Sequence, residues 1–580
     1  MALRCRGLLA AISLVAGLAT TPAAAAAQSA DTPDSLRNEA FEAAQWAIAS
    51  DAADALSRVS ARFAQGDDAL GRLAEEHETL ITRRDALERA LEQLYAAEGD
   101  EAIARRAATR ADYEGVLARL KTVDADIENR FPAYSELTSP RALSVAETQG
   151  LLKPDEALLL VLVNPEATYV WGVSRDRIEW ARAEMGEAAI TTAVETLRKS
   201  LTTAASRGHD QVDPGIDPTI FAGRPVAVFD RAEAHHLYAE LVQPVESVFA
   251  GKTTLITVVT GALTTLPLAV LATEPPTGSD TGPDAFTSTS WLIDRYALAT
   301  LPSVSSLKAL RCYLVSDERD RSPGCPTATG AIGTRRAATA PLSMAAFGAP
   351  LLTGPPEDGS RGAPAADGVF GEGRLADVGK LRALPYLPGS RTELESLKSL
   401  YPSALVRIGA EATESAVRQG DAAALSQARF VVFSTHGLMA GSNAAEPGLV
   451  LTPPETATEA DDGYLSASEA AQLRLRAEFV VLSACNTAAS DGRPGGEGLS
   501  GLARAFFYAG ARSVLVSHWE VSDRATTELI SDTFAALDKP GADVGDRARA
   551  LQTGMRGVRA NRLWRHPAFW APFTLVGEPG

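Results

Sequence analysis

Two short apolar runs in the second half of the chain each end on a chemically reactive side chain. The run that begins at Phe430 leads to His436, and the run that begins at Phe479 leads to Cys485. Apolar runs of this length are typical of buried strands. In a parallel sheet the carboxyl ends of neighbouring strands share one edge, where such sheets place their reactive centres. The sequence therefore favours an open parallel sheet with His436 and Cys485 at one edge.

Strand-like and helical segments alternate through most of the chain after residue 134. Helices are expected over residues 187–201 and 232–249, and capping-box patterns at Ser390–Glu393 and Ser466–Glu469 are expected to begin two more. Strands are expected over residues 157–163, 169–173, 254–259, 296–301, 344–350, 406–408, 430–433, 479–482 and 514–516. This alternation predicts the α/β class with a mainly parallel sheet.

The segment from Ser35 to Phe131 has a different character. It is rich in Ala, Leu, Glu and Arg and contains no proline, which favours long helices. Apolar side chains recur every three or four residues on either side of Gly99, so an antiparallel, coiled-coil-like hairpin is expected to turn there. We find no convincing copy of a 34-residue tetratricopeptide repeat in this region.

The first residues resemble an export signal. Arg4 and Arg6 precede an apolar run over residues 8–19, and an alanine-rich stretch ends at Ala27. This predicts a secretory signal peptide over residues 1–27. A membrane anchor is the alternative, but the run is well short of the roughly 20 residues that span a bilayer. No later segment is long and apolar enough to span, so the mature chain is expected to be soluble and exported, in the periplasm or outside a bacterium.

Charge and cysteine content narrow the function further. The chain has 55 basic and 73 acidic residues, a net charge of -18, and such an acidic chain is a poor nucleic-acid binder. Without the signal, three cysteines remain in an oxidising compartment. Cys312 and Cys325 flank a polar loop and either form a local disulfide or both stay free. Cys485 is left as the odd thiol.

A thiol beside an imidazole predicts nucleophilic chemistry. His436 would accept the proton of the Cys485 thiol and later protonate a leaving amine. The backbone N–H groups of Gly437 and Cys485 are the expected oxyanion donors, and glycines at 495–498 could line a slot for the scissile bond. Either residue alone is more typical of a structural histidine or a core cysteine. The sequence has no metal-ligand spacing, no phosphate-binding glycine motif and no serine elbow, so no metal or cofactor is expected.

The ordered motifs resemble a known family. His436 and Cys485 lie 49 residues apart, close to the spacing of about 50 in caspases, although Ser483 and Thr487 stand where caspases have Gln and Gly. The sequence is more similar to the CHAT-domain family, caspase-like domains often found beside tetratricopeptide repeats. The similar stretches are Ser434–Gly437, Leu482–Thr487, Gly496–Phe506, Ala509–Val514, Ser517–Val521 and His566–Phe573.

The resemblance implies a three-layer, caspase-like αβα domain at residues 342–580, with His436 and Cys485 as its catalytic dyad. We expect it to follow a helical region at 28–133 and an α/β region without a dyad at 134–341, which is the first half of the CHAT-like unit. Asp491, Glu497 and Asp523 are candidates for a pocket that selects Lys or Arg, and solvent-facing acids are the alternative for each.

Two functions follow from this sequence. The first is a secreted cysteine endopeptidase that acts on peptide or protein substrates through Cys485 and His436. The alternative is a non-catalytic or conditionally active CHAT-domain module for binding or signalling, with a protein partner on its N-terminal helical region.

Overall fold

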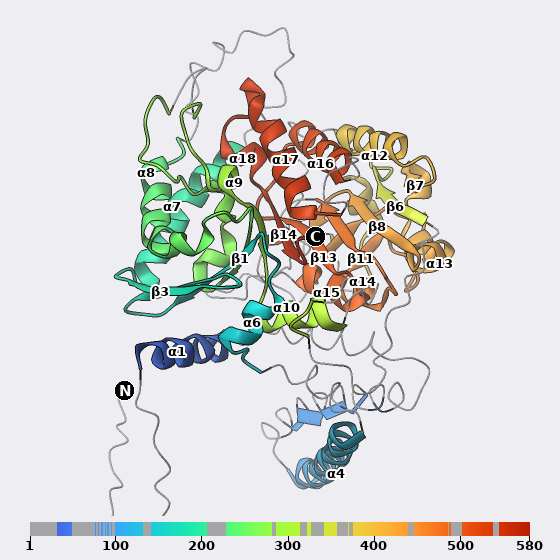
Figure 1. The fold of residues 1–580 in the computed structure, drawn as a ribbon. Coiled ribbons are helices and arrows are strands. Elements are labelled where there is room, and N and C mark those ends of the chain that lie inside the picture. The colour runs from blue at the N-terminus through green and yellow to red at the C-terminus, as the bar shows by residue number, and fades with distance from the viewer. Residues whose placement is uncertain are drawn as a thin grey trace, which may run out of the picture.

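The arrangement of elements is taken from a computed structural model of the chain (Figure 1). It describes residues 32–48, isolated positions between 73 and 94, and residues 99–130, 141–205, 228–280, 286–313, 322–325, 342–355, 369–370, 375–438, 446–484, 487–488, 501–537 and 545–580. The predicted signal peptide, residues 1–27, lies outside this described part. None of the described helices is long and apolar enough to cross a membrane.

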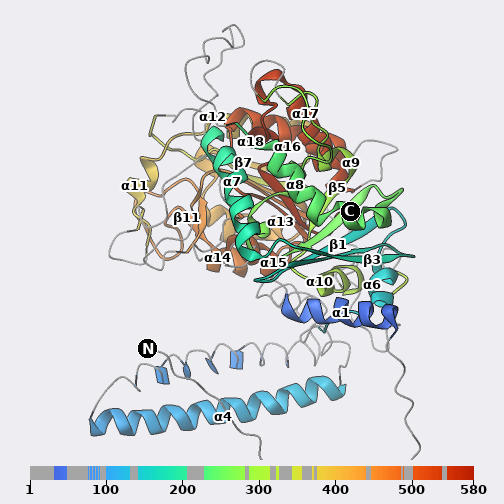
Figure 2. The ribbon, with the colours of Figure 1, turned by 90° about the vertical axis from the view of Figure 1, so that its left-hand side faces the viewer.

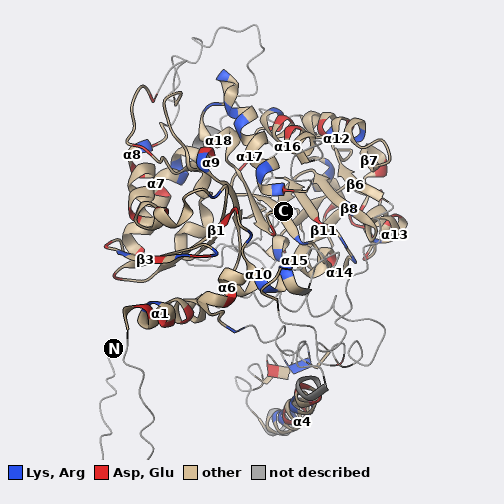
Figure 3. Cartoon of the chain, viewed as in Figure 1, with Lys and Arg blue, Asp and Glu red and all other residues tan. Residues whose placement is uncertain are grey.

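One large mixed sheet forms the centre of the protein, whereas the alternation of apolar runs predicts only that the sheet is mainly parallel. Its strand order is β3-β2-β1-β4-β5-β14-β13-β12-β8-β6-β7. The strands are β1 (Glu156–Val163), β2 (Thr168–Val173), β3 (Ile178–Ala183), β4 (Thr254–Val259), β5 (Ala297–Thr300), β6 (Leu342–Gly348), β7 (Leu405–Ile408), β8 (Ala428–Ser434), β12 (Phe479–Ser483), β13 (Ser513–Ser517) and β14 (Phe573–Gly577). The central strands carry few charged residues, whereas the helices around them carry many (Figure 3).

Most neighbouring strands are parallel. β1, β4 and β5 are parallel to one another, and so are β13, β12, β8, β6 and β7. β14 lies between these two groups and is antiparallel to β13. Strands from before and after the predicted boundary between residues 341 and 342 therefore belong to one sheet, and the division into two α/β units at that point stays a prediction.

Helices cover both faces of the sheet and make the three layers that were expected. On one face lie α7 (Glu187–Ala205), α8 (Arg231–Leu241), α12 (Pro388–Leu400), α16 (Asp523–Leu537), α17 (Arg547–Ala560) and α18 (Pro567–Trp570). On the other lie α6 (Val145–Leu151), α10 (Val304–Lys308), α13 (Ala422–Leu425), α14 (Ala467–Gln472) and α15 (Gly501–Ala509). Successive strand residues point to opposite faces, so Leu158 joins one apolar cluster and Leu159 the other. The predicted α/β class is confirmed.

Local signals explain several helix boundaries. The capping box at Ser466–Glu469 begins α14, as predicted. Gly510 follows α15 with φ of 112°, a left-handed conformation that favours glycine at a helix end. The helix expected over residues 232–249 is interrupted, because Pro244 cannot continue an α-helix. The chain changes there from α8 to a 3₁₀ segment, Gln243–Phe249.

The N-terminal region contains α1 (Pro33–Ala47) and the long α4 (Asp100–Arg130) (Figure 2). α1 is attached to the sheet-bearing part through Gln45, whose side chain exchanges two hydrogen bonds with the backbone of Leu143, at 2.8 and 2.9 Å. α4 begins after Gly99 and returns along the helical positions before it. Arg106 contacts the carbonyl of Leu94 at 2.8 Å, and Arg119 pairs with Glu76 at 2.6 Å. These contacts give the antiparallel hairpin, and its coiled-coil character stays a prediction.

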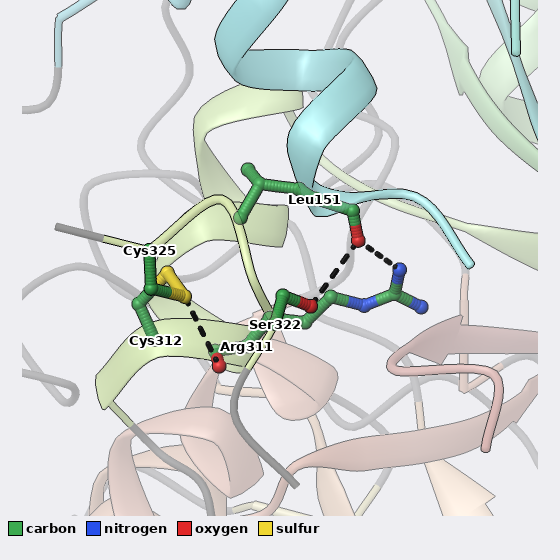
Figure 4. Close-up of a disulfide and its surroundings, with 5 residues drawn as sticks. All are labelled: Leu151, Arg311, Cys312, Ser322 and Cys325. Atoms are coloured by element: carbon green, nitrogen blue, oxygen red, sulfur yellow. Dashed lines mark hydrogen bonds between the residues drawn. A yellow bond between two sulfur atoms is a disulfide. The ribbon is translucent and has the colours of Figure 1, made fainter. Parts of the chain in front are cut away.

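A disulfide joins Cys312 to Cys325, which are 13 residues apart (Figure 4). It holds the short segment 322–325 against the end of α6. The Ser322 hydroxyl donates to the carbonyl of Leu151 at 3.3 Å, and the Gly324 N–H donates to the carbonyl of Gly150 at 3.2 Å. Of the two alternatives that the sequence left open for this cysteine pair, the structure contains the bonded one.

Beside this disulfide, Arg311 is completely buried between two carboxylates. It makes bidentate contact with Glu156 at 2.6 Å and contacts Glu578 at 2.9 and 3.1 Å. One further N–H donates to the carbonyl of Leu151 at 2.7 Å. Arg311 holds the pKa of Glu578 at about 2, against the opposing effect of burial. Arg311, Glu156 and Glu578 thus form a buried ionic triad. It connects the start of β1 with the residue after β14, which are far apart in the sequence.

Candidate functional site

The strands that lead to His436 and Cys485 are parallel neighbours. β8 pairs with β12 in a register that places Ser434 opposite Ser483. The Thr435 N–H also donates to the carbonyl of Ser483 at 3.3 Å. His436 follows Ser434 by two residues, and Cys485 follows Ser483 by two. The two strands thus end at one edge, as the sequence predicts. Cys485 itself lies outside the described residues, so the dyad stays a prediction.

His436 is fully buried and firmly oriented. Its Nε2 lies 2.7 Å from the carbonyl oxygen of Pro385. A carbonyl can only accept, so Nε2 carries the proton, and in the neutral ring the lone pair is on Nδ1. The backbone carbonyl of His436 accepts from the Val450 N–H at 3.0 Å. The arrangement gives an imidazole that can take a proton on Nδ1 while its other nitrogen stays bonded.

A small antiparallel sheet continues directly from His436. Its strands are β9 (Gly437–Leu438), β10 (Gly448–Val450) and β11 (Tyr464–Ser466), in the order β11-β10-β9. Gly437, the predicted oxyanion donor, is buried at the start of β9 and pairs with Leu449. These strands could not be predicted from the sequence, because runs of two or three residues have no measurable periodicity.

A buried acid anchors the far strand of this small sheet. Glu414 Oε2 accepts from the N–H groups of Asp462 at 2.8 Å and Gly463 at 3.2 Å, just before β11. Its other oxygen pairs with Arg418 at 2.5 Å. Burial raises the pKa of Glu414 to about 7, although the bonds from Arg418 and the Asp462 N–H act in the opposite direction. A group that titrates near neutrality therefore supports the sheet that follows His436.

Helix α12 contacts the ends of both strands of the candidate site. The hydroxyl of Ser434 donates to Ser390 Oγ at 2.9 Å, and the hydroxyl of Ser483 donates to Glu393 Oε2 at 3.0 Å. All four residues are fully buried. The capping box predicted for Ser390–Glu393 is therefore wrong. The helix begins earlier, at Pro388, after Leu387, which has no side-chain cap. The side chains of Ser390 and Glu393, which the local pattern assigned to capping, instead form hydrogen bonds with residues at the ends of β8 and β12.

The three acids proposed for a substrate pocket have different outcomes. Asp491 and Glu497 lie outside the described residues. Asp523 is the first residue of α16 and is only 4% exposed, so it is not a solvent-facing acid. Its Oδ2 accepts from the Gly389 N–H at 2.5 Å. A Cβ at position 389 would lie 2.3 Å from that oxygen, so a larger residue there would require the Asp523 side chain to move. Asp523 thus joins α16 to the start of α12, and its role toward substrate stays a prediction.

Two other buried histidines have structural partners. His518 Nε2 contacts Thr574 Oγ1 at 2.9 Å, and burial lowers the pKa of His518 to about 3. His566 Nδ1 accepts from the Ala568 N–H at 3.2 Å and caps α18. Both help to hold the region around β14. Within the described ranges, no group of three or more His, Cys, Asp or Glu residues could hold a metal ion.

Comparison with known proteins gives the family. The model of the CHAT domain matches residues 231–578, which include β8, β12 and His436. Tetratricopeptide repeat protein 28 of Mus musculus is 31% identical over 204 residues, and that of Homo sapiens is 28% identical over 200 residues. Each match covers 30% of this chain and 8% of the relative, so the chain spans a small part of these longer proteins.

Two solved structures are also similar. The Saccharomyces cerevisiae separase–securin complex matches 86% of this chain and 38% of that chain, with 11% identity and a TM-score of 0.40. The complex of Porphyromonas gingivalis RgpB pro- and mature domains matches 68% of this chain and 76% of that chain, with 10% identity and a TM-score of 0.31. The family model covers more than half of the chain, and the protein belongs to the CHAT domain family.

Proposed function

We propose that this protein is a cysteine endopeptidase in which Cys485 is the nucleophile and His436 the general base and acid. The observation that supports this most directly is the hydrogen bond from His436 Nε2–H to the carbonyl of Pro385. It fixes the neutral tautomer in which Nδ1 can accept the thiol proton. The register of β8 and β12 adds support, because Ser434 and Ser483, each two residues before a member of the proposed dyad, lie opposite each other at the strand ends.

The proposed reaction has two stages. His436 Nδ1 takes the proton of the Cys485 thiol, and the thiolate attacks the carbonyl carbon of a peptide bond. The Pro385 carbonyl stabilises the resulting imidazolium, because a charged donor makes the stronger hydrogen bond. The N–H groups of Gly437 and Cys485 donate hydrogen bonds to the oxyanion that forms. His436 then protonates the leaving amine, and water, deprotonated by His436, hydrolyses the thioester.

Peptide selection is proposed to involve an acidic side chain. Asp523 is a buried carboxylate at the start of α16, and it lies next to α12, which contacts both strand ends. A buried carboxylate would favour Lys or Arg on the substrate through charge-assisted hydrogen bonds. Asp491 and Glu497 remain the other candidates for this pocket.

One observation favours the alternative of a conditionally active or binding module. The side chain of His436 is 0% exposed, so a substrate could reach it only after a rearrangement. A protein partner on the N-terminal helical hairpin could supply that rearrangement, and α4 offers a 31-residue helix for it. In this alternative the purified chain would cleave nothing alone and would gain activity with its partner.

A peptide-library assay with purified chain under reducing conditions tests the proposal. Wild type should give defined cleavage products, and Cys485→Ala and His436→Ala should each give none. His236→Ala is the matched control, because its side chain is 52% exposed and lies on α8, far from the candidate site in sequence. Equal cleavage by wild type and Cys485→Ala would reject the nucleophile. A complete absence of cleavage, together with partner binding by both variants, would favour the binding module.

We also propose that the chain is exported to the periplasm or secreted. The basic and apolar character of residues 1–27 supports this, and so does the Cys312–Cys325 disulfide, since disulfides persist in oxidising compartments. Fractionation of expressing cells, with N-terminal sequencing of the mature chain, tests it. An intact N-terminus in the cytoplasmic fraction would reject it.

A further inference from the structure

Ser517, the last residue of β13, makes an unusual set of contacts with the turn after β12. It is fully buried. Its hydroxyl donates to the carbonyl of Ala484 at 2.5 Å and lies 3.3 Å from the Thr487 N–H, which donates to it. Its own N–H donates to Thr487 Oγ1 at 2.8 Å. Its carbonyl accepts from the Ala488 N–H at 2.8 Å.

These bonds hold the backbone on both sides of Cys485. Ala484 comes directly before the cysteine, and Thr487 and Ala488 follow it by two and three residues. The side chains of Ser517 and Thr487 make reciprocal bonds to backbone groups, so the contact differs from an ordinary sheet ladder. Buried polar groups that are bonded this way are costly to disturb. One residue of the neighbouring strand therefore bonds to the described residues on both sides of Cys485.

Ser517 is itself fixed by the residues around it. The N–H of the next residue, His518, donates to the carbonyl of Pro572 at 2.9 Å, and the His518 carbonyl accepts from Arg198 of α7 at 3.2 Å. Trp519 is fully buried and donates from Nε1 to the carbonyl of Ala568 at 2.9 Å. The residues that follow β13 are thus hydrogen-bonded to α7, to α18 and to the residue before β14.

We infer that Ser517 and Thr487 are positioning residues that hold the turn of the nucleophile, an inference that rests on the proposed function of Cys485. In the segment from Ser483 to Thr487, the Thr487 hydroxyl oxygen accepts the hydrogen bond from the Ser517 N–H. The Ser517 hydroxyl donates to the Ala484 carbonyl and accepts from the Thr487 N–H, so it connects the residues before and after Cys485. Neither side chain takes part in proton transfer. Their role is to keep the Cys485 backbone N–H and thiol in a fixed relation to His436, where a misplacement of about 1 Å can cost about 100-fold in rate.

The test compares Ser517→Ala with Ser513→Ala. Ser513 lies at the other end of the same strand, is equally buried, and donates one hydrogen bond, at 2.7 Å, to the carbonyl of Glu578. Ser517→Ala should lower kcat by about 10- to 100-fold with little change in KM. Ser513→Ala should lose similar thermal stability and keep its kcat. Thr487→Val should behave as Ser517→Ala does, and Thr487→Ser, which keeps the oxygen, should recover most of the rate.

A second readout is independent of peptidase activity. The rate of Cys485 alkylation by iodoacetamide is measured against pH in each folded variant. Ser517→Ala and Thr487→Val should shift this profile, whereas Ser513→Ala and Thr487→Ser should follow wild type. If Ser517→Ala folds and keeps both the wild-type kcat and the wild-type profile, the inference is wrong. If wild type cleaves no peptide, the proposed function fails, and the alkylation profiles alone decide whether Ser517 and Thr487 position the cysteine.

Discussion

Glu393 accepts a hydrogen bond at 3.0 Å from the hydroxyl of Ser483, and both side chains are completely buried. The bond joins the interior face of α12 to the final residue of β12, two positions before Cys485. The bond between Ser434 and Ser390, one turn earlier on the same helix, does the same for β8. A single helix therefore contacts the ends of both strands that lead to the proposed dyad.

Removal of the Glu393 carboxyl should destabilise the protein. Glu393→Ala leaves the buried Ser483 hydroxyl without this acceptor, and we expect a loss of about 1–3 kcal/mol in the free energy of unfolding. Denaturant unfolding of Glu393→Ala, Ser483→Ala and the double variant measures it, and the two effects should not add. Glu395→Ala is the control, because that side chain is 60% exposed on the same helix and should change stability by less than about 1 kcal/mol. Fully additive effects would show that the bond has no energetic role.

The buried triad around Arg311 should be essential for folding stability. Arg311→Met leaves Glu156 and Glu578 buried without their cation, and we expect a loss of about 3–5 kcal/mol. Arg549→Ala is the comparison, since its pair with Asp155 is 36% and 41% exposed and should contribute at most about 1 kcal/mol. Thermal unfolding of both variants separates the two cases. Similar losses of stability in the two variants would contradict a larger contribution from the buried ion pairs than from the exposed one.

The disulfide should stabilise the mature chain. Closing a loop of 13 residues is expected to contribute about 3 kcal/mol, so Cys312→Ala with Cys325→Ala should lower the melting temperature. Thiol titration of the unfolded, non-reduced mature chain should find one thiol, from Cys485, and reduction should raise the number to three. Three thiols before reduction would show that the pair is not bonded in the isolated protein.

Glu414 should make stability depend on pH. Its pKa of about 7 in the folded chain is above the ordinary value of 4.5, so the folded state holds more protons than the unfolded state between these pH values. The contribution of Glu414 to stability should therefore decrease as pH rises from about 4.5 to 7. Melting temperatures of wild type and Glu414→Gln across pH 5–8 measure it. The melting temperature of Glu414→Gln should rise relative to that of wild type as the pH increases. A difference in melting temperature that does not vary with pH would contradict the raised pKa of Glu414.

Several features of the candidate site could be predicted because they depend on short-range patterns. Apolar runs predicted β8 and β12, and the proposal of His436 and Cys485 as a dyad followed from their positions two residues after the ends of these strands. The sequence could not show that Ser434 lies opposite Ser483, or that the Pro385 carbonyl orients the imidazole. These contacts join residues that are distant along the chain, and no local periodicity reports them.

The strands that could not be predicted from the sequence differ in their reasons. β3 lies at the edge of the sheet and has no apolar run, because most of its side chains remain partly exposed, and β9, β10 and β11 are too short to show a period. β14 lies between β5 and β13, and its place in the sheet follows from packing rather than from its composition.

Local sequence patterns were sufficient to predict the α/β class and the helical hairpin around Gly99, because periodicity is a local property, and His436 and Cys485 remain a predicted dyad. Tertiary structure decided which strands are neighbours, which nitrogen of His436 holds the proton, and what Ser390 and Glu393 do. At Ser390–Glu393 the local capping pattern was misleading, because both side chains are buried and form hydrogen bonds with Ser434 and Ser483 at the ends of β8 and β12.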